Sequence, residues 1–378
     1  MGYYGGRNLG DEMMLLCLQR WLANHNVELT VLSEGAADIQ QRRGLRAIEN
    51  IPLLGQWAWR DAWLRGKAFR VLAAIARHDA LIIGGGDLIR DDRGWRSFFF
   101  SVEKVIVALC LGRPVYLVNI GIGTPKTRYG RLVLRWALPR CARIIARDAR
   151  TVDLCHRFGA GAITEYAPDI VFSLPRLFEA GEQRSEAARR FALVCLRTQA
   201  NAFGQFAWTD RGIQTFAAAL DRLVEERDLD IVFLPFQALS AGDDDNHVHG
   251  LVLSSMRHRD RATVRSWTAD VREVAQTVAQ AELVVAMRLH AAVLASALNR
   301  RCILMPYDYK VAEFGQQVGL LHHITPRTLE SPATLSAVFD ASFSGPWRRS
   351  VPERVPPASW ETLTLAAPSG EPVPVGCP

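Results

Sequence analysis

Short aliphatic runs alternate with longer amphipathic segments along most of this chain. The segments "RYGRLVLRWALPRC" and "RGIQTFAAALDRLVEE" repeat their apolar residues with the period of a helix that covers a core on one face. The aliphatic runs have the length of buried strands, and they lie at 80–86, 114–123, 142–148, 191–197, 230–236, 282–288 and 301–307. Strands that alternate with helices in this way predict an α/β protein built on parallel sheets.

The alternation breaks at residues 173–190, where polar and charged residues interrupt the strands. A chain of 378 residues is long enough for two domains that each bury a core. We therefore expect two Rossmann-like domains that face a cleft, at residues 1–175 and 176–345. Residues 346–378 are rich in proline and are expected to form a loose tail.

The composition excludes several classes of protein. The apolar fraction of 49% and the charged fraction of 22% are those of an ordinary globular protein. A net charge of +6, with basic residues scattered and no RNA-binding aromatic signature, argues against nucleic acid as a partner. No apolar stretch has the length of a membrane span, and no secretory signal is visible. The seven cysteines lie far apart, mostly in apolar runs, which indicates buried reduced thiols in a cytoplasmic protein.

Three glycine-rich turns lie at predicted strand ends in the first half: "GYYGGRNLGDE", "IIGGGDLIRDD" and "NIGIGTPKT". Glycine lets backbone N–H groups face a ligand, but it also lets a helix pack tightly on a sheet. Either explanation fits one such turn, whereas three turns at the same edge favour a binding surface.

The segment "ELVVAMRLHAAVLASAL" carries the densest set of candidate site residues. Arg288 and His290 follow a strand and begin a helix, where the first N–H groups and the helix dipole favour an anion. A buried core histidine is the alternative for His290. Lys310 follows the next strand and can supply another cation or lie at the surface. Arg147 stands in the same position after 142–146, where it either binds an anion or pairs with Asp148.

Two further segments have competing interpretations. "LPFQALSAGDDDNHVHG" holds three acids and two histidines, but contiguous loop positions rarely converge on one metal ion. We expect no metal there, but a solvated loop from which Gln237 or an aspartate touches the substrate. On a helix, 57–70 would place Trp59, Trp63 and Phe69 along one side, which fits either a membrane interface or packing on the core.

Taken together, these motifs resemble those of the polysaccharide pyruvyltransferase family. The matching stretches run in order from residue 2 to about 320: "GYYGGRNLGDE", "IIGGGDLIRDD", "GIG", "RDARTVDLCHRFG", "APD", "LPFQ", "AMRLHA" and "YDYKVAEF". The resemblance implies a GT-B-like fold and the transfer of pyruvate from phosphoenolpyruvate to hydroxyls of a sugar. A nucleotide-sugar glycosyltransferase of the same architecture and a non-catalytic glycan or anion binder are the alternatives.

The resemblance also assigns roles to residues. His290 and Arg288 would be catalytic, with His290 protonating the donor or only binding its phosphate. No metal or cofactor is implied, since phosphoenolpyruvate is a co-substrate. The donor pocket in the cleft would use Arg147, Arg288, Leu289, His290 and Lys310. The acceptor would lie on the first domain near Asn8, Asp11, Gly84, Gly85, Gly86, Asp87 and Asp92, although Asp11 can instead cap its helix.

The resemblance implies an acceptor in a bacterial-type surface polysaccharide, such as an exopolysaccharide or cell-wall polymer, or its lipid-linked precursor. Peripheral contact with the inner face of the membrane would follow. In this family the first glycine turn follows a full strand, whereas only three residues precede "YGG" here. We therefore expect a start site upstream of Met1.

Overall fold

The computed structural model describes residues 1–23, 27–53, 63–92, 94–178, 189–198, 206–238 and 244–344. The chain divides into two compact units. The first comprises Met1–Gly6 and Met14–Ile170, and the second comprises Arg7–Met13 and the described residues from Val171 onward. The sequence pattern placed the boundary after residue 175 and did not separate 7–13 from its neighbours.

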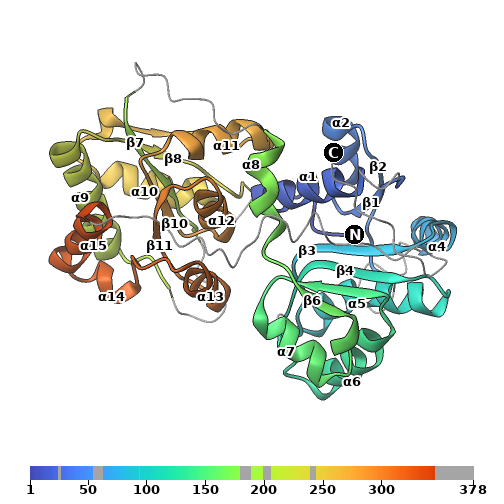
Figure 1. Ribbon diagram of the computed structural model, residues 1–378. Helices are drawn as coiled ribbons and strands as arrows, with labels where there is room; N and C mark the ends of the chain where they lie inside the picture. Colours follow the sequence, from blue (N-terminus) through green and yellow to red (C-terminus); the bar gives the residue numbers. More distant parts are fainter. Residues whose placement is uncertain are drawn as a thin grey trace. The chain divides into compact units, whose positions relative to one another are not determined.

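The second unit is built on one parallel sheet in the order β11-β10-β7-β8-β9 (Figure 1). Its strands are β7 (Phe191–Cys195), β8 (Asp230–Phe233), β9 (Ala262–Val264), β10 (Leu283–Ala286) and β11 (Arg301–Leu304). The chain winds outward from β7 to β9 and then returns to the other side of β7, so β7 and β10 are neighbours. This is the doubly wound order, in which ligands bind beyond the carboxyl ends of the two strands at the reversal.

Helices cover both faces of that sheet. α9 packs against α10, α14 and α15, whereas α12 packs against α11 and α13. Their bounds are α8 (Leu174–Leu177), α9 (Asp210–Arg227), α10 (Asp245–Ser255), α11 (Val271–Gln280), α12 (Leu289–Ala297), α13 (Tyr309–Val318), α14 (Pro326–Leu329) and α15 (Pro332–Ser344). Beyond His290, α12 is mostly apolar and is buried over Ala291–Ser296, because it lies between the sheet and its neighbouring helices.

The first unit has two parallel sheets, of order β1-β2 and β3-β4-β5-β6. The strands are β1 (Thr30–Ser33), β2 (Arg46–Glu49), β3 (Leu81–Ile89), β4 (Val115–Ile122), β5 (Arg143–Ala146) and β6 (Thr164–Tyr166). Met1 and Gly2 lie between the two sheets. Gly84 N–H donates to Met1 O over 2.9 Å, and Gly2 N–H donates to Leu32 O over 3.4 Å. The first glycine turn therefore follows a short bridge between β1 and β3.

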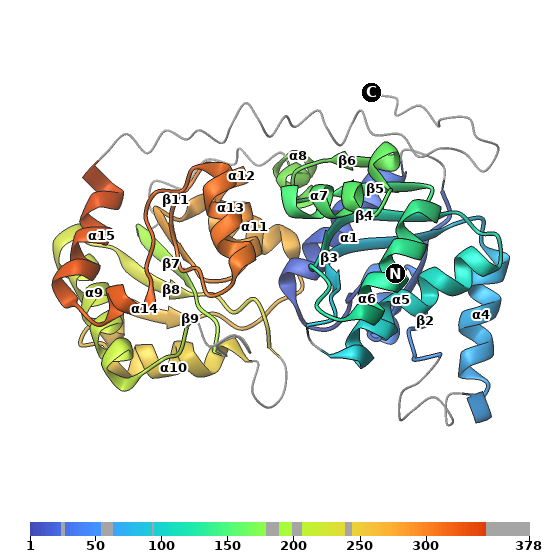
Figure 2. The same ribbon diagram turned by 90° about the horizontal axis from the view of Figure 1, so that it is seen from below.

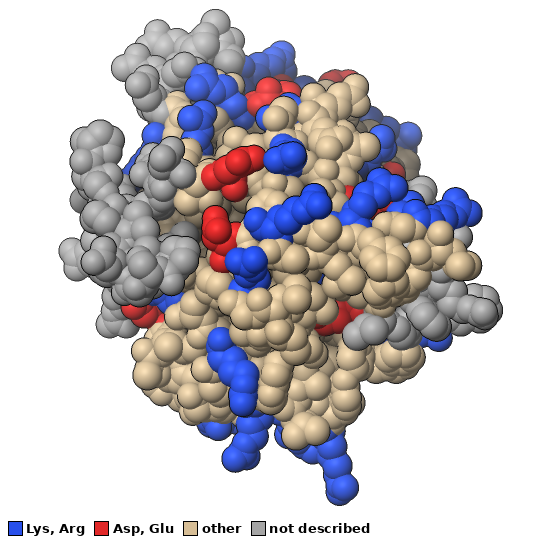
Figure 3. Space-filling view, turned by 90° about the vertical axis from the view of Figure 1, so that its right-hand side faces the viewer, with Lys and Arg blue, Asp and Glu red and all other residues tan. Residues whose placement is uncertain are grey.

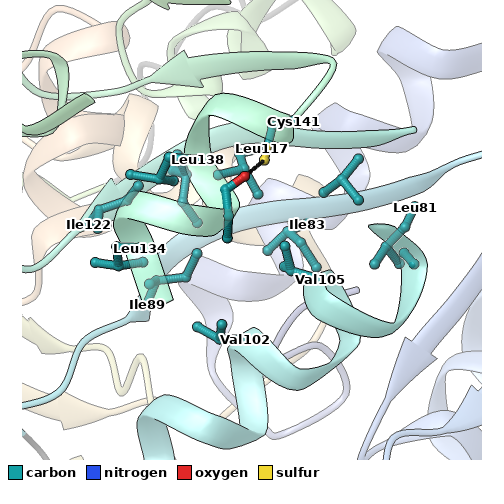
Figure 4. Packing of buried hydrophobic residues seen from close by; sticks show 14 of the residues in the cluster. Leu81, Ile83, Ile89, Val102, Val105, Leu117, Ile122, Leu134, Leu138 and Cys141 are labelled. Carbon is teal, nitrogen blue, oxygen red and sulfur yellow. Dashed lines mark hydrogen bonds between the residues drawn. The ribbon is translucent and has the colours of Figure 1, made fainter. Parts of the chain in front are cut away.

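The helices of the first unit are α1 (Leu9–Ala23), α2 (Ala36–Arg43), α4 (Lys67–Arg77), α5 (Trp95–Cys110), α6 (Arg128–Ala137) and α7 (Ala149–Arg157). α1 begins in the segment grouped with the second unit. α5 packs between α4 and α6 and against β3 (Figures 1 and 2). Ile83 of β3, Val102 and Val105 of α5 and Leu134 of α6 meet in one buried cluster (Figure 4).

The glycine run of β3 has a packing role. Gly85 and Gly86 adopt positive φ angles of 73° and 83°, which side chains rarely tolerate. A Cβ at Gly84 would lie 2.7 Å from both Leu18 Cδ2 and the Tyr4 hydroxyl. Close packing of α1 and the first turn on β3 therefore accounts for these glycines, whether or not they also contact a ligand.

Each of the seven predicted aliphatic runs coincides with a strand or part of one, and every strand pair among the described residues is parallel, as the sequence pattern predicted. The pattern missed β1, β2, β6 and β9. Of the described cysteines, five are buried, but Cys110 is exposed, contrary to the prediction of buried thiols. Within the described residues, no helix is long and apolar enough to cross a membrane.

Two leucines of α6 allow a matched test of this core. Leu134 is 1% exposed, whereas Leu132 is 68% exposed. Leu134→Ala should lower the free energy of unfolding by about 2–4 kcal/mol, because it leaves a cavity among well-packed neighbours. Leu132→Ala should change it by less than about 0.5 kcal/mol. Denaturant unfolding followed by circular dichroism measures both, and equal effects would contradict this packing of α6.

Candidate active site

The carboxyl ends of β7 and β10 bring two arginines to the point where the strand order of the second unit reverses. Arg197 follows β7 and Arg288 follows β10. The strand ends are tied together, since Met287 N–H donates to Cys195 O over 2.9 Å and Arg197 N–H points at Met287 Sδ over 3.3 Å. Basic residues therefore stand beyond the strand ends at which doubly wound sheets bind ligands.

Arg288 is held by a buried carboxylate. Its Nε lies 3.2 Å and 3.1 Å from the two oxygens of Asp245, and its Nη2 donates to Asp245 Oδ1. Its Nη1 donates to Gln237 Oε1 over 2.8 Å. Asp245 also accepts the backbone N–H groups of Phe236 and Gln237, over 3.0 and 2.9 Å. The guanidinium is thus fixed on two sides, and removing one partner of such a buried pair costs about 3–5 kcal/mol.

A second cluster surrounds the buried hydroxyl of Tyr307, which follows β11. Arg197 Nη1 donates to this hydroxyl over 2.9 Å, and the guanidinium carbon lies 5.0 Å from the ring centroid. Burial would raise the pKa of Tyr307, but the charges of Lys310, Arg197 and Arg288 and the hydrogen bond from Arg197 outweigh it and lower the pKa. The charges of Lys310, Arg197 and Arg288 therefore all favour the ionised form of this hydroxyl, and the next residue, Asp308, is the N-cap of α13.

His290 lies in the first turn of α12, two residues after the N-cap residue Arg288. An arginine side chain carries only donors and cannot cap the first N–H groups of the helix, so the positive end of the dipole adds to the cations. The ring of His290 packs on Gly10 in the segment 7–13. A Cβ at Gly10 would lie 2.1 Å from Nδ1 of His290. Glycine at this position is thus needed to seat the imidazole.

The segment 7–13 is anchored by the same network. Leu9 N–H donates to Phe236 O over 2.8 Å, and Asn8 Nδ2 lies 3.3 Å from Gln237 Oε1. Asn8 also caps α1, because its Oδ1 accepts the N–H groups of Gly10 and Asp11 over 3.0 and 3.3 Å. Asn8 and Asp11, which the sequence placed with the first domain, belong to the second unit, and the cap is Asn8 rather than Asp11.

The other predicted residues lie in the first unit. Arg147, after β5, is 8% exposed and donates to Asp87 over 2.7 Å and to Asp169 over 3.4 Å. Burial opposes its charge, but Asp87, Asp169 and Asp148 outweigh burial and raise the pKa of its guanidinium. Asp148, the alternative partner, instead caps α7 by accepting the Thr151 N–H over 2.8 Å.

Arg90 extends this network along the same edge of the first unit. It donates to Asp92 over 2.6 Å and 3.0 Å and lies 3.4 Å from Asp87. The edge is richer in carboxylates than in cations. It therefore differs in charge from the basic edge of the second unit.

The prediction of a solvated loop before His249 was wrong for Asp245 and His249. α10 begins at Asp245, and both side chains are fully buried. Asp244 caps this helix by accepting the Asn246 N–H over 2.9 Å. Among the described residues, no group of His, Cys, Asp or Glu has the arrangement of a metal site. Asp243 lies outside them.

The second unit contains four of the five residues predicted for the donor pocket, Arg288, Leu289, His290 and Lys310, whereas Arg147 lies in the first unit. Their joint role in one pocket stays a prediction. The structure adds the contacts of Arg288 with Asp245 and of Arg197 with Tyr307. Arg197 was overlooked although it follows a predicted strand, as Arg147 and Arg288 do. That shared position after a strand was the signal available in the sequence. Asp245 could not be recognised, because an acidic run gives no indication of which carboxylate is buried.

The basic edge and its residues coincide with the motifs of one family. Residues 8–309 match the family model described as polysaccharide pyruvyl transferase. The chain belongs to this family. It is therefore a transferase, and Arg197, Arg288, His290 and Tyr307 all lie within the matched region. No curated protein matches the chain.

Solved structures show that this polysaccharide pyruvyl transferase has a GT-B fold of two Rossmann-like domains. UDP-GlcNAc 2-epimerase from Methanocaldococcus jannaschii superposes with a TM-score of 0.60 at 12% identity, over 89% of this chain and 91% of that one. The Neisseria meningitidis UDP-GlcNAc 2-epimerase gives 0.56 at 11%, over 95% and 93%. A glycosyltransferase from Rickettsia africae gives 0.53 at 11%, over 89% and 85%. At such identities the likeness shows the fold alone.

His249 makes the stability of the transferase depend on pH. Its Nε2 accepts the Leu196 N–H over 3.2 Å, and burial together with the charge of Arg288 lowers its pKa from 6.5 to about 3. Between these values the unfolded chain binds a proton that the folded chain does not, so stability falls as the pH falls below 6.5.

His249→Gln keeps a side-chain acceptor for the Leu196 N–H but removes the group that takes up a proton between pH 7 and pH 5. Between pH 7 and pH 5 the wild type should lose about 2 kcal/mol more of its free energy of unfolding than the variant. Denaturant titrations at the two pH values measure this difference. Parallel losses in the two proteins would show that His249 is not the buried neutral group described here.

Proposed function

We propose that this transferase moves pyruvate from phosphoenolpyruvate to hydroxyls of a sugar and forms a pyruvyl ketal. The acceptor is a bacterial-type surface polysaccharide or its lipid-linked precursor, used at the inner face of the membrane. The observation that carries the proposal is the pair Arg197 and Arg288 at the strand reversal of the second unit, with His290 in the first turn of α12 and with Lys310 of α13 acting on the same Tyr307 as the two arginines.

The charges of this group match those of the donor. Phosphoenolpyruvate carries a carboxylate and a phosphate on a three-carbon frame, so it requires several fixed cations close together. Arg288 is oriented by Asp245 and Gln237 before any ligand arrives, and guanidinium groups bind such anions through paired N–H donors. Lys310 supplies a compact charge near the same hydroxyl of Tyr307.

Chemistry begins when His290 donates a proton to the methylene carbon of the donor. Positive charge develops at C2, and a sugar hydroxyl attacks that carbon and gives up its own proton. The C2–O bond to phosphate then breaks, inorganic phosphate leaves, and a second hydroxyl closes the ketal. The seat of His290 on Gly10 holds the imidazole in place for the first step.

The carboxylate-rich edge of the first unit suits an acceptor. Asp87 and Asp92 are each held by Arg90, and carboxylate oxygens accept hydrogen bonds from sugar hydroxyls. The donor role of Arg147 remains a prediction from the family resemblance; this arginine pairs with Asp87 and Asp169, as Arg288 pairs with Asp245. Donor binding as proposed here rests on the second unit.

Phosphate release from phosphoenolpyruvate, measured with a panel of free and lipid-linked sugars, tests the reaction. Release should require a sugar, and Arg288→Ala should lower kcat/KM at least 100-fold, since a buried charged contact is lost. Arg211→Ala, at an exposed arginine that bonds to Glu330 O, is the matched control. If no phosphate is released and a nucleotide sugar stabilises the protein, the proposal is overturned in favour of a glycosyltransferase. If there is neither phosphate release nor stabilisation by a nucleotide sugar, a non-catalytic glycan or anion binder is favoured.

The acid role of His290 predicts a loss in kcat rather than in donor affinity. His290→Gln should lower kcat at saturating phosphoenolpyruvate about 100-fold or more, within the range of general acid catalysis. The variant retains a polar side chain, so donor binding should change much less. Near-normal kcat would restrict His290 to phosphate binding.

Gly10→Ala should reproduce part of the loss in kcat expected for His290→Gln, although it leaves the imidazole itself unchanged. The added Cβ must displace the ring of His290, whereas the fold should persist because alanine is a good helix former. We expect kcat to fall about tenfold. Gly250→Ala, on α10 with no atom within 4 Å of the new Cβ, is the control and should retain full activity. Equal activity of the two variants would show that the position of the ring does not matter.

A further inference from the structure

Helix α6 of the first unit has an exposed face that neither its core packing nor the proposed chemistry explains. Gly130, Leu134 and Ala137 are buried against the unit. On the outer face Leu132 is 68% exposed and Tyr129 is 43% exposed. Single exposed apolar residues are normal on proteins, so what requires explanation is their grouping on one helix.

The apolar surface continues from α6 onto the first turns of α5. The rings of Tyr129 and Phe99 lie 5.0 Å apart, and those of Phe99 and Trp95 lie 6.1 Å apart. Trp95 is 53% exposed, and Trp136, one helical turn beyond Leu132, is 36% exposed. The two helices therefore share one aromatic and aliphatic surface, which we call the α5–α6 surface.

Basic residues accompany this surface, and acidic residues are missing from the segment that forms α6. Residues 126–140 contain no Asp or Glu. The guanidinium of Arg140 lies 5.0 Å from the ring centroid of Trp136. In the lower part of Figure 3, at the height where Figure 1 shows α6, blue side chains project from a tan surface. The basic side chains of the segment are Lys126, Arg128, Arg131, Arg135 and Arg140.

Hydrogen bonds to Asp91 and Thr127 fix the start of α6. Asp91 accepts the N–H groups of Lys126 and Thr127 over 2.9 and 2.8 Å and the Thr127 hydroxyl over 2.7 Å. Thr127 in turn caps α6 by accepting the Gly130 N–H over 2.9 Å. The helix is therefore formed in the folded unit and does not need a partner to fold.

We propose that the α5–α6 surface binds a phospholipid bilayer that contains anionic lipids. Leucine and tryptophan side chains enter the interface between headgroups and chains, while arginines reach past them to the phosphates. An anionic bilayer suits both properties of the surface, its apolar centre and its exposed basic side chains. The inference goes beyond the proposed transfer reaction and does not depend on it.

The segment 57–70, considered at the sequence level for this role, is less suited to it. Residues 57–62, including Trp59, lie outside the described residues. Trp63 donates its Nε1–H to Leu53 O over 2.9 Å and packs against the buried cluster. Phe69 is exposed, but Trp63 serves the core. Core packing, the alternative named for this segment, therefore explains Trp63.

Co-sedimentation of the full chain with vesicles tests the proposal. The wild type should bind vesicles of phosphatidylglycerol and phosphatidylcholine, bind pure phosphatidylcholine far more weakly, and be released by salt. The double variant Arg131→Glu/Arg135→Glu should lower the partition coefficient at least tenfold, and Leu132→Ser/Trp136→Ser should lower it similarly. All four side chains lie on the outer face, so melting temperature and phosphate release with a free sugar should be unchanged.

The matched controls carry the same kinds of change in the second unit, where Leu321 is 84% exposed and the side chains of Arg189 and Arg257 are 71% and 68% exposed. Arg189→Glu/Arg257→Glu and Leu321→Ser should bind vesicles as the wild type does. Equal binding by the α6 variants and the wild type would overturn the proposal. So would absence of vesicle binding together with a dimer that the α6 variants dissociate, which would make a second copy of the chain the occupant.

Discussion

The buried pair of Arg288 and Asp245 connects most of what distinguishes the second unit. Asp245 starts α10 and accepts two backbone N–H groups from the strand end before it, so the carboxylate joins β8 to its helix. Arg288 joins the same carboxylate to the start of α12. Because neither charge can be buried alone, the pair fixes the ends of β8 and β10 relative to each other. His249 lies close enough for the charge of Arg288 to help keep it neutral.

The two units differ in the balance of carboxylates and cations at the ends of their strands. In the first unit Arg90 and Arg147 are matched by Asp87, Asp92 and Asp169, so the carboxylates outnumber the arginines. In the second unit Asp245 pairs with Arg288, but the charges of Lys310, Arg197 and Arg288 still lower the pKa of the buried Tyr307 phenol. A basic edge favours an anionic donor, whereas a carboxylate edge favours hydroxyls. This difference supports the proposed division between donor and acceptor.

The sequence predicted the central strands and singled out Arg288 and His290 because both have a local signal. Buried parallel strands are continuous aliphatic runs, and Arg288 and His290 stand directly between such a run and a helix. β2, β6 and β9 gave no such signal, because they are strands of three or four residues with exposed positions. The burial of Asp245 and the contact of Gly10 with His290 depend on residues far apart in the chain. No local pattern carries such information.

Equilibrium binding of phosphoenolpyruvate by calorimetry tests the central claim most directly, because it isolates donor binding from catalysis and from the acceptor. Arg197→Gln should weaken binding about 10-fold to 100-fold through loss of a charged contact, whereas Arg265→Gln, at a half-exposed arginine on the same unit, should leave it unchanged. Equal affinities of the two variants, or a wild type that binds UDP-GlcNAc in place of phosphoenolpyruvate, would contradict a donor site at the strand reversal.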